Sequence, residues 1–310
     1  MSRVIGRLAP SPTGVLHLGN ARSFLLAWLS VRAQDGQLLM RIEDLDGPRI
    51  RRGAEQECLQ DLEWLGLDWD GPIVRQSERI FLYDEALNQL LKQGQAYACT
   101  CSRKEVERAA SAPHAGDDGP IYPGTCRNKN IPRQTEGAAF RFLVPAGEVT
   151  FQDAFCGNCS VAVTKDLGDF VIYKRDGEAA YQLAVVVDDV AMGVTEVLRG
   201  DDLLTSAARQ LQIGEALGCA MPSYVHVPLV VGEDGRRLAK RHGDTSLRAF
   251  RNQGVSAETI LGWLAWSCGL QNDATPCRAE ELIDVFHMNK LSRKQVVWSG
   301  DLKAPMLWRE

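Results

Sequence analysis

The 310-residue sequence contains no apolar run approaching the roughly 20 residues needed to cross a bilayer, and no signal peptide opens it. Internal repeats and low-complexity tracts are also absent. Positive charge is not in excess: the net charge is −5, so any contact with nucleic acid must come from local basic patches. Nine cysteines without a secretory signal predict reduced thiols, a cytoplasmic location and no membrane partner.

A conspicuous motif near the N-terminus is His17-Leu-Gly-Asn20. It follows an apolar strand predicted over Val4–Ala9 and a Pro/Gly-rich turn, and it opens an amphipathic helix. Gly14 and Gly19 permit a tight turn, and the N–H groups of a helix start can bind an anion. A histidine at such a turn can donate to phosphate oxygens. By itself, such a motif is more often a capped helix start.

A second motif, Arg237-Leu-Ala-Lys-Arg241, follows a β-rich run over Tyr224–Val231 and a turn over Gly232–Gly235. It places cations on a loop, which alone is typical of a solvated surface. Together, the two motifs supply donors around a triphosphate whose charge rises in the transition state of adenylate transfer. The pair therefore favours ATP chemistry.

Strands alternate with helices in the first 95 residues, which predicts a parallel sheet with helical crossovers and hence an α/β fold. We expect the second half of this sheet to resume after residue 180, with a strand buried on both faces over Leu183–Val187. The other expected elements are helices over Leu18–Leu29, Cys58–Leu65, Ile80–Leu91 and Leu203–Leu217, and a strand over Leu38–Ile42.

Residues 96–180 differ in texture, with cysteines, a Pro/Gly/Asp-rich stretch and short β-like runs, and they are interpreted as an insertion. Ser102–Glu105 matches a capping box and predicts a short helix. The nucleotide-binding domain is then split between residues 1–95 and 181–245. Residues 246–310 form a helical C-terminal region, with helices expected over Leu247–Phe250, Ile260–Trp266 and Leu282–Phe286.

Cys99, Cys101 and Cys126 form a plausible partial metal site, because zinc prefers four tetrahedral ligands of this kind. Tyr122 and His114 are both candidates for the fourth position, and unrelated buried thiols are the alternative to a site. No position would remain open for a substrate, so the metal should be structural.

Cys156-Gly-Asn-Cys159 is a competing pair. A redox CxxC usually lies at a helix start after a strand. Here, Gly157-Asn158 is interpreted as a hairpin turn between strands over Val149–Asp153 and Val161–Val163. This favours an incidental or auxiliary thiol pair over a metal site.

Four further segments, with the two motifs above, resemble class I aminoacyl-tRNA synthetases of the glutamyl branch, in the order of that family from about residue 3 to about residue 250. The resemblance implies a Rossmann-like, doubly wound sheet. These segments are Arg7–Gly14, Arg41–Asp44, Tyr181–Ala184 and Val197–Gly200.

The short C-terminal region and the cysteine pattern are similar to those of the glutamyl-queuosine tRNA(Asp) synthetase family, truncated paralogues of the glutamyl enzymes. That resemblance implies a ligase that activates L-glutamate with ATP and Mg²⁺ and transfers it to queuosine in the anticodon loop of tRNA(Asp). It also implies one structural Zn²⁺, Tyr122 as the fourth metal ligand, and no anticodon-binding domain.

The resemblance assigns roles to individual residues, and glutamate, with one ammonium and two carboxylates, needs both signs of charge. A guanidinium grips a carboxylate with two parallel hydrogen bonds. The implied catalytic residues are His17 and Lys240. The implied glutamate-binding residues are Arg7, Ser11, Glu43, Tyr181 and Arg199, and the implied ATP-binding residues are His17, Gly19, Asn20 and Lys240. Asn20 stands where the family often has a second histidine.

Two other functions remain open from the sequence. One is a truncated glutamyl-tRNA synthetase that charges a tRNA 3′ end. The other is a non-catalytic, zinc-containing RNA-binding paralogue, against which the intact set of His17, Lys240, Arg7 and Glu43 speaks. The basic residues around the second motif are the candidates for RNA contact: Arg236, Arg237, Lys240, Arg241, Arg248 and Arg251.

Overall fold

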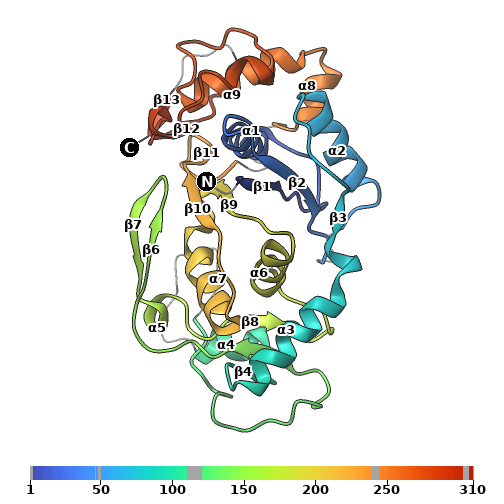
Figure 1. Ribbon diagram of the computed structural model, residues 1–310, viewed down its shortest axis with the longest axis vertical. Coiled ribbons are helices and arrows are strands. Elements are labelled where there is room, and N and C mark those ends of the chain that lie inside the picture. Colours follow the sequence, from blue (N-terminus) through green and yellow to red (C-terminus); the bar gives the residue numbers. More distant parts are fainter. Residues whose placement is uncertain are drawn as a thin grey trace.

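A computed structural model describes residues 3–45, 47, 50–109, 121–238, 244–302 and 307–309. Buried parallel strands form the centre of the fold (Figure 1). One sheet has the order β1–β2–β3, all parallel, and the other has the order β7–β6–β10–β9, with only β7 antiparallel to its neighbour. The strands are β1 (Ile5–Leu8), β2 (Gln37–Ile42), β3 (Val74–Arg75), β6 (Val149–Asp153), β7 (Gly157–Val161), β9 (Glu196–Gly200) and β10 (Ser223–Val227).

β1 lies against β9, which joins the two sheets. The Ile5 carbonyl accepts from the Thr195 N–H at 2.8 Å, and the Ile5 N–H donates to Thr195 Oγ1 at 2.9 Å. The chain adds β2 and β3 on one side of β1 and returns to the other side with β9 and β10. Such a reversal of strand order opens a crevice at the carboxyl ends of the strands, where doubly wound sheets bind ligands. The predicted α/β fold with a parallel sheet is confirmed.

Helices flank this centre, and α1 packs against both β1 and β9. No helix in the described ranges combines the length and the apolar character that a bilayer span would require. The α-helices are α1 (Leu18–Arg32), α2 (Ala54–Trp64), α3 (Ile80–Lys92), α4 (Arg103–Ala109), α5 (Val163–Asp166), α6 (Tyr181–Ala191), α7 (Leu204–Leu217), α8 (Leu247–Asn252) and α9 (Ala257–Cys268). The 3₁₀ helices are η2 (Gln76–Glu78), η3 (Asp201–Leu203), η5 (Ala279–Leu282) and η6 (Met288–Lys290).

The strand predicted over Leu183–Val187 is wrong, because these residues lie inside α6. The run is apolar all round, and a short apolar run cannot be assigned to strand or helix by periodicity alone. A helix with apolar residues on every side is a buried one. Leu183 and Val186 are indeed fully buried against α3 and α7, and the last turn of the helix buries the two carboxylates of Asp188 and Asp189.

Residues 96–180 form two separate parts. The first is an antiparallel sheet in the order β4–β5–β8, at the end of the molecule away from the C-terminal region (Figure 1). Its strands are β4 (Ala96–Cys99), β5 (Ala139–Phe142) and β8 (Val171–Tyr173). Ser102 caps α4 reciprocally: its N–H donates to Glu105 Oε2 at 2.6 Å and its hydroxyl accepts from the Glu105 N–H at 3.3 Å, so the predicted capping box is confirmed.

The second part is the β6–β7 hairpin, which extends the central sheet through β10. The hairpin was predicted, but its turn was misplaced. Asp153 pairs with Gly157, so the turn comprises residues 154–156, and Gly157-Asn158 begins β7. The turn closes on the Asp153 carboxylate, which accepts the N–H groups of Phe155 and Cys156. The Asp153 side chain therefore stabilises this turn, which lies before Gly157-Asn158.

The C-terminal region is less helical than predicted. α8 and α9 cover two of the three expected helices, but the third, over Leu282–Phe286, is wrong: η5 ends at Leu282 and turns follow. Strands β12 (Gln295–Val297) and β13 (Leu307–Arg309) were missed. β12 pairs in parallel with β11 (Val230–Val231), so the region is bound to the central part by backbone hydrogen bonds.

Arg22 on α1 ties the C-terminal region to the centre. Its buried guanidinium donates to the carbonyl of Pro228, between β10 and β11, and to the carbonyl of Ser267 on α9. α9 crosses α1 and approaches a neighbouring loop closely at Gly262. A Cβ built on Gly262 would lie 2.3 Å from the carbonyl oxygen of Thr275.

This close approach predicts that Gly262→Ala destabilises the protein. Overpacking against backbone typically costs about 1–3 kcal/mol, which exceeds the roughly 1 kcal/mol that alanine gains over glycine in a helix. Gly214→Ala in α7 is the matched control, because its Cβ would meet only the flexible side chain of Met221. Thermal and urea unfolding should show a lower midpoint for Gly262→Ala than for Gly214→Ala. Equal midpoints would contradict the packing argument.

Candidate active site

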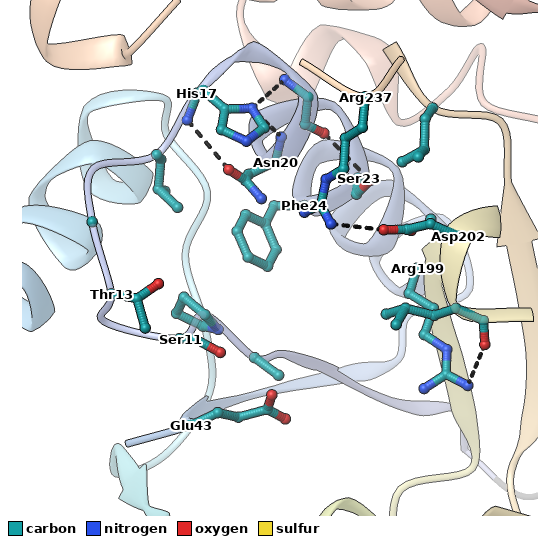
Figure 2. A pocket seen from close by; sticks show the side chains of 18 of the residues that line it. Ser11, Thr13, His17, Asn20, Ser23, Phe24, Glu43, Arg199, Asp202 and Arg237 are labelled. Atoms are coloured by element: carbon teal, nitrogen blue, oxygen red, sulfur yellow. Dashed lines mark hydrogen bonds and ion pairs between the residues drawn. The ribbon is translucent and has the colours of Figure 1, made fainter. Parts of the chain in front are cut away.

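A pocket of about 540 Å³ opens at the carboxyl ends of β1 and β9, where the fold places its crevice. His17 and Glu43 lie at opposite ends of it, and Arg199 forms part of one wall (Figure 2). All the predicted catalytic, glutamate-binding and ATP-binding residues within the described part of the chain line this pocket, whereas Lys240 lies outside the described residues. The lining residues from the prediction are Arg7, Ser11, His17, Gly19, Asn20, Glu43, Tyr181 and Arg199.

His17 is the N-cap of α1, and the Nδ1 atom of its ring accepts the capping hydrogen bonds. Nδ1 accepts the N–H groups of Gly19 at 3.1 Å and Asn20 at 3.4 Å, and Asn20 Oδ1 accepts the His17 N–H at 3.4 Å. Burial, and secondarily the cation of Arg237, lower the pKa of His17 to about 4. The neutral ring therefore carries its proton on Nε2, which is left to donate.

This arrangement refines the sequence prediction of a helix-start anion site. The first amides of α1 donate to His17 Nδ1 in this structure, so the donor presented to an anion is the imidazole rather than those two N–H groups. Asn20, in the position where the family often has a second histidine, completes the reciprocal cap. Its role here is to hold His17 in place.

Arg7 and Glu43 place opposite charges on the floor of the pocket. Arg7 is the last residue but one of β1, and its polar contacts are long: 3.5 Å from Nε to Asp189 Oδ1 and 3.5 Å from Nη1 to the Leu198 carbonyl. Burial lowers the pKa of the Arg7 guanidinium. A buried guanidinium with only long contacts can take a ligand carboxylate without giving up a strong partner.

Arg41, which the sequence prediction did not assign to the site, holds this floor together. It is fully buried and donates from Nη1 to Asp189 Oδ1 at 2.6 Å and from Nη2 to Glu43 Oε1 at 3.1 Å. Burial alone would lower the pKa of Arg41, but the carboxylates of Asp189, Glu43 and Asp188 raise it above its usual value. Burial raises the pKa of Glu43, and Arg41 opposes that effect.

Arg199 is held on three sides at the end of β9. Nε donates to His226 Nε2 at 3.0 Å, Nη1 to the Tyr181 hydroxyl at 3.5 Å and Nη2 to the Leu203 carbonyl at 3.4 Å. His226 in turn contacts Asp153 at 2.6 Å. The sequence analysis missed both residues, although a histidine inside the apolar run of β10 was a visible signal.

The described residues on either side of the 239–243 segment lie beside His17. Residues 239–243 are not described. Before them, the backbone of Arg237 forms an isolated antiparallel β-bridge with Val231, and Arg237 Nη1 contacts Asp202 Oδ2 at 2.8 Å (Figure 2). After them, the backbone of Ser246 forms an isolated antiparallel β-bridge with His17, and the Leu18 N–H donates to the Thr245 carbonyl at 3.1 Å. Arg237, the first residue of the second motif, therefore lines the same pocket as His17.

Two of the basic residues named as candidates for RNA contact, Arg248 and Arg251, form ion pairs with residues of α2. Arg248 contacts Glu57 at 2.7 Å and Arg251 contacts Asp61 at 3.1 Å, so both fasten α8 to α2. Arg251 also lies over the ring of Trp64. The Arg248–Glu57 pair is exposed, and pairs of that kind contribute little stability, whereas Asp61 in the second pair is buried. Both pairs reduce the positive charge available to RNA.

The predicted cysteine cluster is assembled away from the pocket, after β4. The sulfurs of Cys99, Cys101 and Cys126 all lie within 4.8 Å of one another, and this is the one such group of three or more His, Cys, Asp or Glu ligands in the described ranges. The Tyr122 hydroxyl lies 3.3 Å from Cys99 Sγ and 3.5 Å from Cys101 Sγ, and accepts the Cys126 N–H at 2.8 Å. These four side chains could hold a metal.

Of the competing candidates for the metal, Cys156 and Cys159 do not join this group. His114 lies outside the described residues. Cys156 and Cys159 belong to the β6–β7 hairpin, and the Cys156 thiol contacts the carbonyl of His226 instead.

Comparison with known proteins defines the class. The catalytic-domain family of class I tRNA synthetases for E and Q matches residues 3–302, so the chain belongs to that family. It is 50% identical to a protein of Rhodopirellula baltica named "Glutamyl-Q tRNA(Asp) synthetase", across 94% of this chain and 93% of that protein. It is 38% identical to the "Glutamate--tRNA ligase" of Aquifex aeolicus, across 97% of this chain but 65% of that protein.

A solved structure supports the same class. The crystal structure of a glutamate tRNA ligase from Elizabethkingia meningosepticum, in complex with its amino acid, matches with a TM-score of 0.82 and 28% identity. The match covers 97% of this chain and 68% of that one.

Proposed function

We propose that this protein is a ligase that activates L-glutamate with ATP and transfers it to queuosine in the anticodon loop of tRNA(Asp). The observation that carries the proposal is one pocket in which Arg7, Arg199 and Glu43 lie beside the His17 turn. The 50% identity over nearly the whole length of a protein named for glutamyl-Q tRNA(Asp) supports the choice of acceptor.

Glutamate fits the pocket through charge. Arg7 takes one carboxylate with help from Ser11, and Glu43 pairs with the α-ammonium. Tyr181 and Arg199 complete the set on the β9 side. Because Arg41 and Asp189 hold Glu43 and Arg7 from below, the two charges are oriented before the substrate arrives, which lowers the cost of binding.

In the first step, the glutamate α-carboxylate attacks the ATP α-phosphorus and expels pyrophosphate. His17 donates from Nε2 to a phosphate oxygen, the start of α1 at Gly19 and Asn20 accommodates the nucleotide, and Lys240 stabilises the pentavalent transition state. Mg²⁺ accompanies the ATP and neutralises phosphate charge. In the second step, a hydroxyl of the acceptor attacks the activated carbonyl and AMP leaves.

We also propose that the chain is divided into three regions. Residues 1–95 and 181–245 form the split nucleotide-binding domain, because β1, β2, β9 and β10 build the crevice. Residues 96–180 form the insertion, which carries the cysteine cluster. Residues 246–310 form the C-terminal region, and its α8 contacts α2 beside the crevice.

We also propose that the metal is one structural Zn²⁺ held by Cys99, Cys101, Cys126 and Tyr122. Ligands at about 2.3 Å from a tetrahedral zinc lie about 3.8 Å apart, and the sulfurs and the hydroxyl fit that scale. Zinc bound at such a site connects distant segments of the insertion, and its binding free energy stabilises the folded state of the insertion.

Glutamate activation is tested by pyrophosphate exchange into ATP. Wild-type protein should exchange with glutamate, and Lys240→Ala should cut the rate about a hundredfold or more, the typical effect of losing one transition-state donor. Lys92→Ala, an exposed lysine at the end of α3, is the control and should behave as wild type. No exchange with or without tRNA would favour a non-catalytic RNA-binding paralogue, and robust exchange with glutamine would contradict the role of Arg7.

The zinc proposal is tested by metal analysis of purified variants. One zinc per chain should disappear in Cys99→Ser, Cys101→Ser or Cys126→Ser, and hydrogen exchange should accelerate within residues 96–180, because structural zinc contributes directly to folding. The Cys156→Ser, Cys159→Ser double variant is the matched control and should keep its metal. Zinc that vanishes with that double variant would show that the ligands were chosen wrongly.

The acceptor is tested with radiolabelled glutamate. Label should attach to queuosine-containing tRNA(Asp), survive removal of the 3′-terminal adenosine and be absent from tRNA(Asp) lacking queuosine. An unstacked loop nucleotide suits a protein site, because recognition of RNA favours splayed-out bases. Label lost with the terminal adenosine, or equal label on tRNA(Glu), would instead indicate a truncated glutamyl-tRNA synthetase.

A further inference from the structure

A chain of buried hydrogen bonds lies behind the wall of the pocket and connects Arg199 to His226 and Asp153. Arg199 lines the pocket, whereas His226 and Asp153 do not. Asp153 Oδ2 lies 2.6 Å from His226 Nδ1, and His226 Nε2 accepts from Arg199 Nε at 3.0 Å. Asp153 and His226 are completely buried and Arg199 is 5% exposed. The three residues come from β6, β10 and β9, neighbouring strands of one sheet.

The contacts of Asp153 determine where the protons of this chain lie. Its Oδ1 accepts three backbone N–H groups, from Phe155 at 2.9 Å, Cys156 at 2.8 Å and His226 at 3.2 Å. A carboxylate that accepts several N–H bonds is held in its ionised form. The ionised Oδ2 then requires a donor, which places the imidazole proton of His226 on Nδ1.

That tautomer leaves the lone pair of His226 Nε2 facing Arg199. It can accept the Arg199 Nε–H, whereas the opposite tautomer would set two N–H donors against each other. The ring is also fixed in orientation: it stacks on Tyr224, with ring centroids 5.9 Å apart and planes 21° apart. The same Tyr224 ring lies beneath the Arg199 guanidinium, 5.1 Å from its central carbon.

Arg199 is therefore fixed by the short hydrogen bond at Nε, while the contacts of its two terminal nitrogens are long. Nη1 and Nη2 lie 3.5 Å and 3.4 Å from their partners, on Tyr181 and Leu203. A guanidinium fixed at Nε keeps its outer fork oriented, so little rotamer freedom is lost when a carboxylate binds.

We infer that Asp153 and His226 form a positioning pair that sets the tautomer and orientation needed to fix Arg199 for a carboxylate of the amino-acid substrate. This inference rests on the proposed function, because that proposal supplies the glutamate. It also gives the β6–β7 hairpin a role at the pocket, since Asp153 is the last residue of β6.

Two substitutions at His226 separate the contacts of the ring. His226→Asn keeps a donor near the position of Nδ1 for Asp153 but offers Arg199 no acceptor. His226→Gln places an amide oxygen near the position of Nε2 and so keeps the Arg199 contact. If the pair positions Arg199, His226→Asn should raise KM for glutamate about tenfold, the scale of one lost hydrogen bond to a charged group. kcat and KM for ATP should stay within about threefold, and His226→Gln should recover most of the glutamate KM.

Asp153→Asn tests the tautomer. The amide oxygen can still accept the three backbone N–H groups, but the amide N–H₂ then faces His226 and forces its proton onto Nε2. This variant should therefore raise KM for glutamate as His226→Asn does. Cys159→Ser, on β7 of the same hairpin, is the control and should leave both constants unchanged.

Nitrogen NMR of the histidine side chains gives a readout that does not depend on catalysis. The wild-type His226 ring should be neutral with its proton on Nδ1, and Asp153→Asn should shift that proton to Nε2. A wild-type ring protonated on Nε2 would overturn the inference even if the enzyme is active. So would equal rises in glutamate KM for His226→Asn and His226→Gln. A wild-type protein that shows the expected tautomer but exchanges no pyrophosphate with glutamate would instead refute the proposed function.

Discussion

The site depends most on the buried guanidinium of Arg41. It lies completely out of solvent among the carboxylates of Asp189, Asp188 and Glu43, and it links β2 to the last turn of α6. Removing one partner of such a group leaves an uncompensated buried charge, which typically costs about 3–5 kcal/mol. Because Asp188 also accepts from Arg79 and Tyr83, the same charge cluster fastens α6 to η2 and α3.

This cluster explains why a pocket for a zwitterion can exist between two sheets. If the side chains of Arg7 and Glu43 were free to move, neither charge would have a fixed position to pair with the opposite charge of a substrate. Asp189 restrains the first and Arg41 restrains the second, so each sign of charge keeps its place. The arrangement is close to neutral without substrate, and an amino acid with separated charges can enter without leaving either protein charge unpaired.

The sequence predicted the elements that carry strong local signals. Turn glycines and helical periodicity placed α1, α2, α3 and β2, and the motifs placed the pocket residues, because each motif lies at a strand end or a helix start. It failed where tertiary context decides. Leu183–Val187 is apolar on every side and fits a buried strand or a buried helix. Arg41 and His226 lie inside apolar strands, where a single polar residue gives no local sign of its distant carboxylate partner.

The pocket therefore does not depend on β1, β2, β9 and β10 alone. Asp153 belongs to the hairpin that follows the β4–β5 sheet, yet it reaches the back of Arg199 through one imidazole. The hairpin is held against the centre by β10 and by Arg293, whose Nη1 donates to the Phe155 carbonyl at 2.8 Å. Since Arg293 precedes β12 in the C-terminal region, all three parts of the chain contribute to the orientation of one arginine. A change in the hairpin or in the C-terminal region can thus alter amino-acid binding without touching the pocket.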